Sequence, residues 1–222
     1  MIDQKVQAAS QLISGVLVEG AEVCVTSSFQ VECVALVHML IQQHPDIPVL
    51  FLETGYHFPE TLAYRDRMAS EWNLNLINLA AKQSVVDQEA QFGILNQTAP
   101  DECCKLRKVE PLFEGLSKYA VWFTALRREQ SPTRANLKAV EPFKLPNGKV
   151  LKKISPLADW TNQDVWAYLG RYNIPALPLY DLGYTSVGCQ PCTIPPIDPD
   201  DPRSGRWQGK GKLECGIHIS AT

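Results

Sequence analysis

The chain has 222 residues, 45% of them apolar, which suits one large domain with a buried core. Its 21 basic and 24 acidic residues give a net charge of −3, which argues against a nucleic-acid-binding or membrane-binding surface. No apolar run reaches the roughly 18 residues of a membrane span, and the N-terminus lacks the charged-then-apolar layout of a secretion signal. We therefore expect a cytoplasmic protein, and in that reducing compartment paired cysteines more often bind metals or react than form disulfides.

The first half of the chain alternates helical and strand patterns. In chain order, we expect a helix over 4–17, a strand over 22–26, a helix over 31–41, a strand over 49–52, a helix over 59–72 and a strand over 74–79. Apolar residues at helical spacing indicate the helices, and short apolar or alternating runs indicate the strands. Strands separated by helices predict the α/β class, with a mostly parallel sheet covered by helices on both faces.

The second half begins with more helix and ends without regular structure. The expected elements are a helix capped by Asp101 that carries 103–108, a strand over 119–123, a hairpin around 146–148 between strands near 137–143 and 149–154, and a helix to Arg171 that opens with a capping box at 161–164. Proline and glycine are frequent from Pro195 onward. We therefore divide the chain into an α/β domain over 1–194 and a C-terminal tail over 195–222, which is either held by specific contacts or mobile.

A polar turn, Ser27-Ser28-Phe29-Gln30, follows the first predicted strand and precedes a helix. In α/β sheets this is where phosphate groups bind, and the two serine hydroxyls would add donors to the backbone N–H groups. The turn matches neither a P-loop nor a GxGxxG motif and contains no glycine. An anion site and a plain connection between strand and helix therefore stay equally open for this segment.

Four of the seven cysteines form two pairs, the adjacent Cys103 and Cys104 and the Cys-x-x-Cys motif of Cys189 and Cys192. A Cys-x-x-Cys pair chelates a metal or forms a redox disulfide. Adjacent cysteines suit a compact tetrahedral zinc site poorly, but they can attach to separate irons of a [4Fe–4S] cluster. Spacing alone leaves an iron–sulfur cluster, a zinc ion and unligated thiols open as interpretations.

Cys215 lies in a different setting. Lys210 and Lys212 precede it, and nearby cations lower the pKa of a thiol from about 8.5 and raise its reactive thiolate fraction. We interpret Cys215 as a nucleophile, with an inert, exposed cysteine as the alternative. The remaining two, Cys24 and Cys33, lie within apolar stretches and are predicted to be core residues.

Several basic residues stand out on a chain that is acidic overall. They are Arg107, Lys108, Arg127, Arg128, Arg134, Arg203 and Arg206. If folding brings them together they form an anion pocket, and otherwise they are solvated surface charges. A reactive thiol, a candidate metal centre and an anion pocket together indicate redox chemistry on a small anionic substrate.

Taken together, these segments resemble one family of enzymes. The matching motifs, in chain order, are SSF (27–29), ETGYHFPET (53–61), CC (103–104), RKVEPL (107–112), RREQSPTR (127–134), PLADW (156–160), GCQPCT (188–193), RSGRW (203–207) and ECGIH (214–218). The chain is similar to the assimilatory adenylyl-sulfate reductases, within the larger adenylyl- and phosphoadenylyl-sulfate reductase family. The motifs are in order and cover nearly the whole chain.

The resemblance implies an adenine nucleotide α-hydrolase-like fold, related to ATP pyrophosphatases. It also implies one [4Fe–4S] cluster, held by Cys103, Cys104, Cys189 and Cys192. Relatives without these cysteines generally use the 3′-phosphorylated nucleotide, so the implied substrate is adenosine 5′-phosphosulfate. Gln30 stands where relatives often have glycine and Glu53 where they often have aspartate, and both departures bear on the nucleotide contacts.

The family mechanism implies that the Cys215 thiolate attacks the sulfur of the phosphosulfate, releases AMP and leaves an S-sulfocysteine. A free thioredoxin then releases sulfite. Basic side chains stabilise the anionic reactants electrostatically. The substrate-binding residues that we expect are Ser27, Ser28, Lys108, Arg127, Arg128, Arg134, Arg203 and Arg206. His218 is expected to orient or polarise the sulfate, and the protein to be a homo-oligomer.

Three alternatives stay open. A phosphoadenylyl-sulfate reductase can also keep the cluster. An ATP pyrophosphatase, such as a tRNA-thiolating or nucleotidyl-transfer enzyme, is expected to carry a Ser-Gly-Gly-x-Asp-Ser loop, which residues 26–30 do not match. A non-catalytic protein could use the four paired cysteines for a structural zinc ion.

Overall fold

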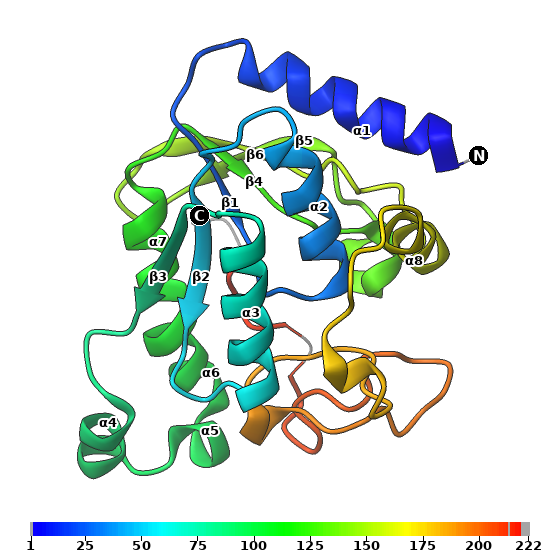
Figure 1. Cartoon of the computed structure of the whole chain (residues 1–222). Coiled ribbons are helices and arrows are strands. Elements are labelled where there is room, and N and C mark those ends of the chain that lie inside the picture. The colour runs from blue at the N-terminus through cyan, green and yellow to red at the C-terminus, as the bar shows by residue number, and fades with distance from the viewer. Residues whose placement is uncertain (1, 213, 219–222) are drawn as a thin grey trace.

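A six-stranded sheet in the order β3-β2-β1-β4-β6-β5 forms the centre of the computed structural model, which describes residues 2–212 and 214–218 (Figure 1). The strands are β1 (Val23–Thr26), β2 (Val49–Glu53), β3 (Leu76–Ala80), β4 (Val121–Phe123), β5 (Val140–Lys144) and β6 (Val150–Ile154). Neighbouring strands pair in parallel, except that β5 runs antiparallel to β6 at one edge. The mostly parallel sheet that the sequence predicts is therefore confirmed.

Helices cover both faces of the sheet. They are α1 (Ile2–Leu17), α2 (Val31–Ile41), α3 (Pro59–Glu71), α4 (Val85–Phe92), α5 (Leu95–Thr98), α6 (Pro100–Cys104), α7 (Glu110–Leu116) and α8 (Asn162–Arg171), with a π-helical turn over Lys105–Val109 between α6 and α7. Successive side chains of a strand point to opposite faces. Accordingly, Val121 and Phe123 of β4 pack in the core beneath α1, α2 and α8, whereas Trp122 packs on the other face with α7 and the β5–β6 hairpin.

Local sequence signals explain several of these elements. Thr161 and Asp164 form the predicted capping box of α8: the Thr161 hydroxyl accepts from the Asp164 N–H at 3.1 Å, and the Asp164 carboxylate accepts from the Thr161 N–H at 2.7 Å. The hairpin turns at Gly148, whose φ of 85° suits glycine. The prediction that Asp101 caps a helix is wrong, because Ala99 occupies the N-cap and Asp101 lies in the first turn of α6.

The chain after α8 lies across the carboxyl ends of the strands (Figure 1). It contains short 3₁₀ turns and two isolated bridges, Thr193 with Arg206 and Asp198 with Asp201. The Trp207 N–H donates to the Cys192 carbonyl at 3.1 Å, and the Trp207 side chain is buried. The described part of the predicted tail is thus held by specific contacts, while its separation from residues 1–194 as a unit stays a prediction. Among the described residues, no helix has the length and apolar character needed to cross a membrane.

Candidate active site

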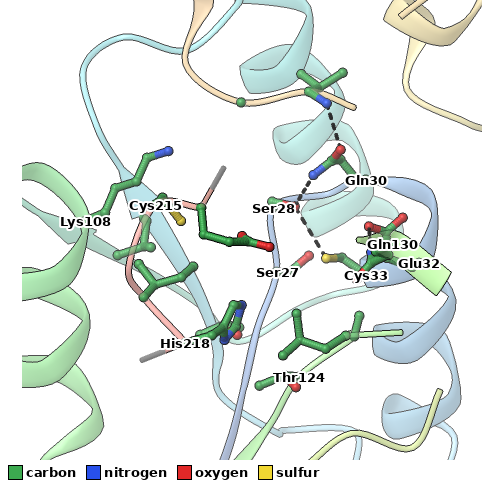
Figure 2. A pocket seen from close by; sticks show the side chains of 18 of the residues that line it. Ser27, Ser28, Gln30, Glu32, Cys33, Lys108, Thr124, Gln130, Cys215 and His218 are labelled. Carbon is green, nitrogen blue, oxygen red and sulfur yellow. Dashed lines mark hydrogen bonds between the residues drawn. The ribbon is translucent and has the colours of Figure 1, made fainter. Parts of the chain in front are cut away.

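A pocket of about 170 Å³ opens where β1, β2 and β4 end. The residue after each of these strands lines it, namely Ser27, Thr54 and Thr124, and all three are buried. In α/β proteins with parallel strands, ligands bind outside the carboxyl ends of the strands. The C-terminal tail forms the opposite wall, so residues far apart in the sequence enclose one cavity (Figure 2).

The Ser27-Ser28 turn is one wall of this pocket. The Ser27 hydroxyl accepts from the Phe29 N–H at 3.1 Å, and Phe29 adopts a left-handed φ of 58°. Gln30 donates to the Ser28 hydroxyl at 3.1 Å and accepts from the Val187 N–H at 2.8 Å. The glutamine that departs from the family pattern therefore ties the turn to the segment before Cys189.

The second departure, Glu53, points elsewhere. Its carboxylate accepts from Arg65 at 3.0 Å and from the Gly55 N–H at 3.0 Å. It therefore helps to shape the loop after β2, while the neighbouring Leu52 and Thr54 face the pocket.

The four paired cysteines surround a second, much smaller cavity of about 10 Å³. Cys103 and Cys104 come from α6, Cys189 directly precedes the 3₁₀ turn Gln190–Cys192, and Cys192 ends that turn. Burial, together with the neighbouring thiols, raises the pKa of Cys103 to about 12. Within residues 2–212 and 214–218, no group of three or more Cys, His, Asp or Glu side chains converges closely enough to hold one metal ion. The thiols therefore line a space and do not meet at a point.

Lys108 lines both cavities, and Figure 2 shows its place in the pocket that contains Cys215. It lies in the π-helical turn that follows the cysteines of α6, and such turns are frequent at functional sites. Burial alone would lower its pKa, but the electrostatic effect of the neighbouring Cys189, Cys215 and Cys104 outweighs burial and holds the pKa of Lys108 above its usual value. Its ammonium group is therefore a permanent cation between the paired cysteines and Cys215.

The neighbouring Arg107 stabilises the local structure through hydrogen bonds and a ring contact. Its guanidinium is buried, donates to the Thr54 carbonyl and to Gln88 at 3.0 Å, and lies over the Tyr56 ring. Arg107 lines the small cavity with the four paired cysteines, but it does not line the pocket at the strand ends. Arg107 thus stabilises the surrounding structure, whereas Lys108 faces the pocket that contains Cys215.

Three of the five predicted substrate-binding arginines line the pocket at the strand ends: Arg134, Arg203 and Arg206. Arg206 is held by Ser186, which accepts its hydrogen bond at 3.3 Å, and by the Trp207 ring, whose centroid lies 4.4 Å from the guanidinium carbon. Because Arg206 is desolvated, its positive charge is poorly compensated by water, and an anion in the pocket would compensate it.

Arg127 and Arg128 lie outside this pocket, unlike the expectation for substrate-binding residues. Arg127 is buried and donates to the Trp160 carbonyl at 3.3 Å and to Glu129 at 3.2 Å, beside a neighbouring cavity of about 370 Å³. Arg128 donates to the Leu137 carbonyl at 2.7 Å and pairs with Asp159. Both arginines brace the loops around the pocket.

Cys215 and His218 reach the pocket on the tail. Cys215 lies on the same side as Lys108 (Figure 2), and Gly216 follows it with a φ of 87° that favours glycine. The His218 ring stacks on Trp122, with 5.4 Å between centroids and 15° between planes. Burial, and then the charge of Lys153, hold the pKa of His218 well below its usual value. Both expected roles of His218, orienting and polarising the sulfate, stay predictions.

The pocket also contains residues that sequence reasoning did not assign to it. Cys33, predicted to be a core residue, lies 3.4 Å from the Ser28 hydroxyl and faces the pocket. Glu32 and Gln130 join it on the side opposite Cys215 (Figure 2). Glu214 lies beside Cys215. The only sequence signal for Glu214 is its place in the ECGIH motif.

Known proteins are similar to this chain in sequence and in fold. The model of the phosphoadenosine phosphosulfate reductase domain matches residues 22–195. The adenosine 5′-phosphosulfate reductase of Streptomyces coelicolor is 46% identical over 90% of this chain and 83% of its own length. The phosphoadenosine 5′-phosphosulfate reductase of Gloeobacter violaceus is 44% identical over the same shares.

Solved structures support the predicted fold. The phosphoadenylyl-sulfate reductase of Candida auris has a TM-score of 0.72 at 23% identity, covering 87% of this chain and 96% of that one. The FMN adenylyltransferase of Candida glabrata has a TM-score of 0.67 at 15% identity, covering 88% and 65%. The fold is therefore the adenine nucleotide α-hydrolase-like fold expected from the sequence. With the family model and the identities above, the chain belongs to the phosphoadenosine phosphosulfate reductase family.

Proposed function

We propose that this protein reduces adenosine 5′-phosphosulfate to sulfite and AMP in assimilatory sulfate reduction. One observation carries the proposal: the Cys215 thiol shares a single pocket with the Ser27-Ser28 turn, Lys108 and Arg206. The turn lies at the carboxyl ends of the strands, where α/β proteins bind nucleotides. Fixed cations beside the thiol would stabilise the charge that develops when the thiol attacks an anionic sulfuryl group. The names of the relatives above support the same class of substrate.

In the proposed reaction the Cys215 sulfur attacks the sulfur of the phosphosulfate. A bond forms between the two sulfur atoms, and the bond from sulfur to the bridging oxygen breaks, with its electron pair leaving on AMP. Lys108 and Arg206 stabilise the negative charge that accumulates. A thiolate of reduced thioredoxin then attacks Cys215 and expels sulfite, and its second thiol resolves the mixed disulfide, so that the dithiol supplies both electrons.

We propose that the four paired thiols hold a [4Fe–4S] cluster, which binds one thiolate at each of its four irons. The supporting observation is that all four cysteines line one small cavity beside Lys108 and Arg107. A structural zinc ion, held tetrahedrally by four thiolates, is the alternative. When bound, the cluster would supply charge next to Lys108. We also place the protein in the cytoplasm as a homo-oligomer.

Replacing Cys192 with serine is expected to remove most of the bound iron, because a cluster loses one of its four ligands. Iron content and visible absorption of the purified protein measure this. Cys33→Ser is the matched control, since Cys33 is a half-buried thiol outside the small cavity. Stoichiometric zinc in the wild-type protein, with no iron, would refute the cluster.

The proposed activity is tested by mixing the wild-type protein with adenosine 5′-phosphosulfate in the absence of reductant. Intact mass should rise by about 80 Da, the mass of an SO₃ group on a covalent nucleophile, and peptide mapping should place it on Cys215. One AMP should be released for each adduct. Release of pyrophosphate from ATP, without any adduct, would instead identify an ATP-pyrophosphatase.

Nucleotide preference is tested by steady-state rates with the two nucleotides at equal concentration and with reduced thioredoxin. We expect faster turnover of adenosine 5′-phosphosulfate than of its 3′-phosphorylated form. Equal or reversed rates would favour the activity that the Gloeobacter relative's name describes.

A further inference from the structure

Glu214, the residue immediately before Cys215, is bound by four neighbouring side chains. Arg134 donates to its carboxylate through two nitrogens, at 3.0 and 2.8 Å, and the Ser131 and Thr133 hydroxyls donate at 3.2 Å each. Arg203 adds a longer contact at 3.5 Å. A bidentate contact, in which two guanidinium nitrogens donate to one carboxylate, is among the strongest and most directional polar contacts in proteins.

This contact is shielded from water. The side chains of Glu214 and Arg134 are only 22% and 13% exposed. Although burial alone would raise it, the charge of Arg134 holds the pKa of the Glu214 carboxyl below its usual value. The ion pair is therefore fully charged at neutral pH, and it is screened by salt less than an exposed pair would be.

Arg134 is itself fixed by the rest of the pocket. Its other amino group donates to Gln130, and Gln130 in turn donates to Glu32 at 2.6 Å. Glu32 lies in the first turn of α2, directly after the Ser27-Ser28 turn. A continuous chain of polar contacts thus runs from the residue before Cys215 to the opposite wall of the pocket.

The tail needs such an attachment because it fills part of the pocket. Glu214, Cys215 and His218 all line a cavity of about 170 Å³, which is smaller than the roughly 300–1,000 Å³ of most small-molecule sites. The attack also requires that the tail bring Cys215 to the same place in the pocket in every reaction cycle. A 1 Å error in the position of a reacting group can cost about 100-fold in rate.

Resting on the function proposed above, we propose that Glu214 is a positioning residue for Cys215. Its carboxylate docks on the Arg134 guanidinium and returns the thiol to one place at the pocket, while it makes no contact with the reacting sulfur itself. Arg134 therefore serves the tail when Cys215 is at the pocket.

A positioning role affects the rate of attack by Cys215 but not the affinity for the nucleotide, whereas a general role in binding would lower both. Without the carboxylate, Cys215 returns less accurately and attack slows. Nucleotide affinity, in contrast, should hold or tighten slightly, because Arg134 and Arg203 are released from a competing anion. Loss of a charged hydrogen-bond pair corresponds to about a 10- to 100-fold slower attack.

The test is the single-turnover rate of the adduct on Cys215, at saturating adenosine 5′-phosphosulfate, for wild type, Glu214→Gln and Glu214→Asp. Gln should slow the reaction by about 10- to 100-fold, and Asp, which keeps the charge, should restore part of the rate. Affinity for the same nucleotide, measured with each change combined with Cys215→Ser, should differ by less than about threefold from Cys215→Ser alone. Glu129→Gln is the matched control, since Glu129 is a 52% exposed carboxylate that pairs with Arg127 and not with the tail.

Limited trypsin digestion gives a readout that needs no activity. The Lys212 side chain is only 7% exposed and pairs with Asp101, so a docked tail protects it. Cleavage after Lys212 should accelerate in Glu214→Gln and stay unchanged in Glu129→Gln.

The outcomes separate the two proposals. If the wild-type protein forms no adduct, the proposed function fails, and digestion alone decides whether Glu214 holds the tail. If the wild type reacts and Glu214→Gln reacts equally fast, Glu214 is not a positioning residue. An equal loss of rate and of nucleotide affinity would also overturn the proposal, because it would make Glu214 part of the general structure of the pocket.

Discussion

Replacing Cys215 with serine is expected to abolish both the covalent adduct and sulfite release. A serine hydroxyl is almost entirely protonated at neutral pH and is a far weaker nucleophile than a thiol. Loss of a nucleophile typically lowers turnover by roughly 10⁴-fold or more. Intact mass after incubation with adenosine 5′-phosphosulfate should match the unmodified protein, and sulfite formation with thioredoxin should fall to background.

Cys33→Ser is the control for this experiment, because Cys33 and Cys215 are both half-buried cysteines that line the pocket at the strand ends. The burial of Cys33, together with the charge of Glu32, raises its pKa to about 11, so its thiol is unreactive at neutral pH. This variant should still form the adduct of about 80 Da. An adduct that persists in Cys215→Ser and disappears in Cys33→Ser would identify Cys33 of α2 as the nucleophile and refute the role of Cys215.

Replacing Lys108 with alanine is expected to lower kcat/KM for adenosine 5′-phosphosulfate by about 100- to 1,000-fold, the usual effect of removing one preorganised group that stabilises developing charge. Lys108 is the cation that faces both the paired cysteines and Cys215. Its loss removes the charge that offsets repulsion between an incoming thiolate and an anionic sulfuryl group. Steady-state rates, with iron content measured on the same sample, provide the test.

Lys105→Ala is the matched control for Lys108. Lys105 lies three positions earlier in the same π-helical turn, but its side chain is 56% exposed and pairs with Glu102 on the surface. Solvent-exposed ion pairs contribute little to stability, so activity should stay within about twofold of wild type. Full activity of Lys108→Ala with intact iron content would eliminate the role of Lys108.

The central strands of the sheet could be predicted from the sequence because they are short and mostly buried. In β1 and β2 nearly every residue is apolar, and the helices between them show the expected spacing. Elements without such patterns were not predicted: α4 is mostly exposed and α5 is only four residues long. The wrong cap at Asp101 has a similar cause, because Pro100 already begins the helix and leaves Ala99 as its cap.

The site was harder to predict than the fold, since it depends on where long side chains point. Arg127 and Arg134 lie in one motif, but Arg127 points to Trp160 and Arg134 points into the pocket. Their spacing does not distinguish them, because the loop between them has two 3₁₀ turns and no regular period. The partner of Glu214 could not be identified for the same reason: Arg134 is far away in sequence and is brought close only by the fold.

The two cysteine pairs have a consequence for the order in which the molecule is assembled. Between α6 and the 3₁₀ turn at Cys189 and Cys192, the chain builds β4, β6 and α8. In an unfolded chain, joining the pairs through a shared ligand would close a long loop, at an entropic cost on the order of 4 kcal/mol. Once the sheet has formed, that cost has already been met and the small cavity exists. Folding of the sheet therefore favours ligand capture, and we expect the proposed cluster to enter a chain that has already folded.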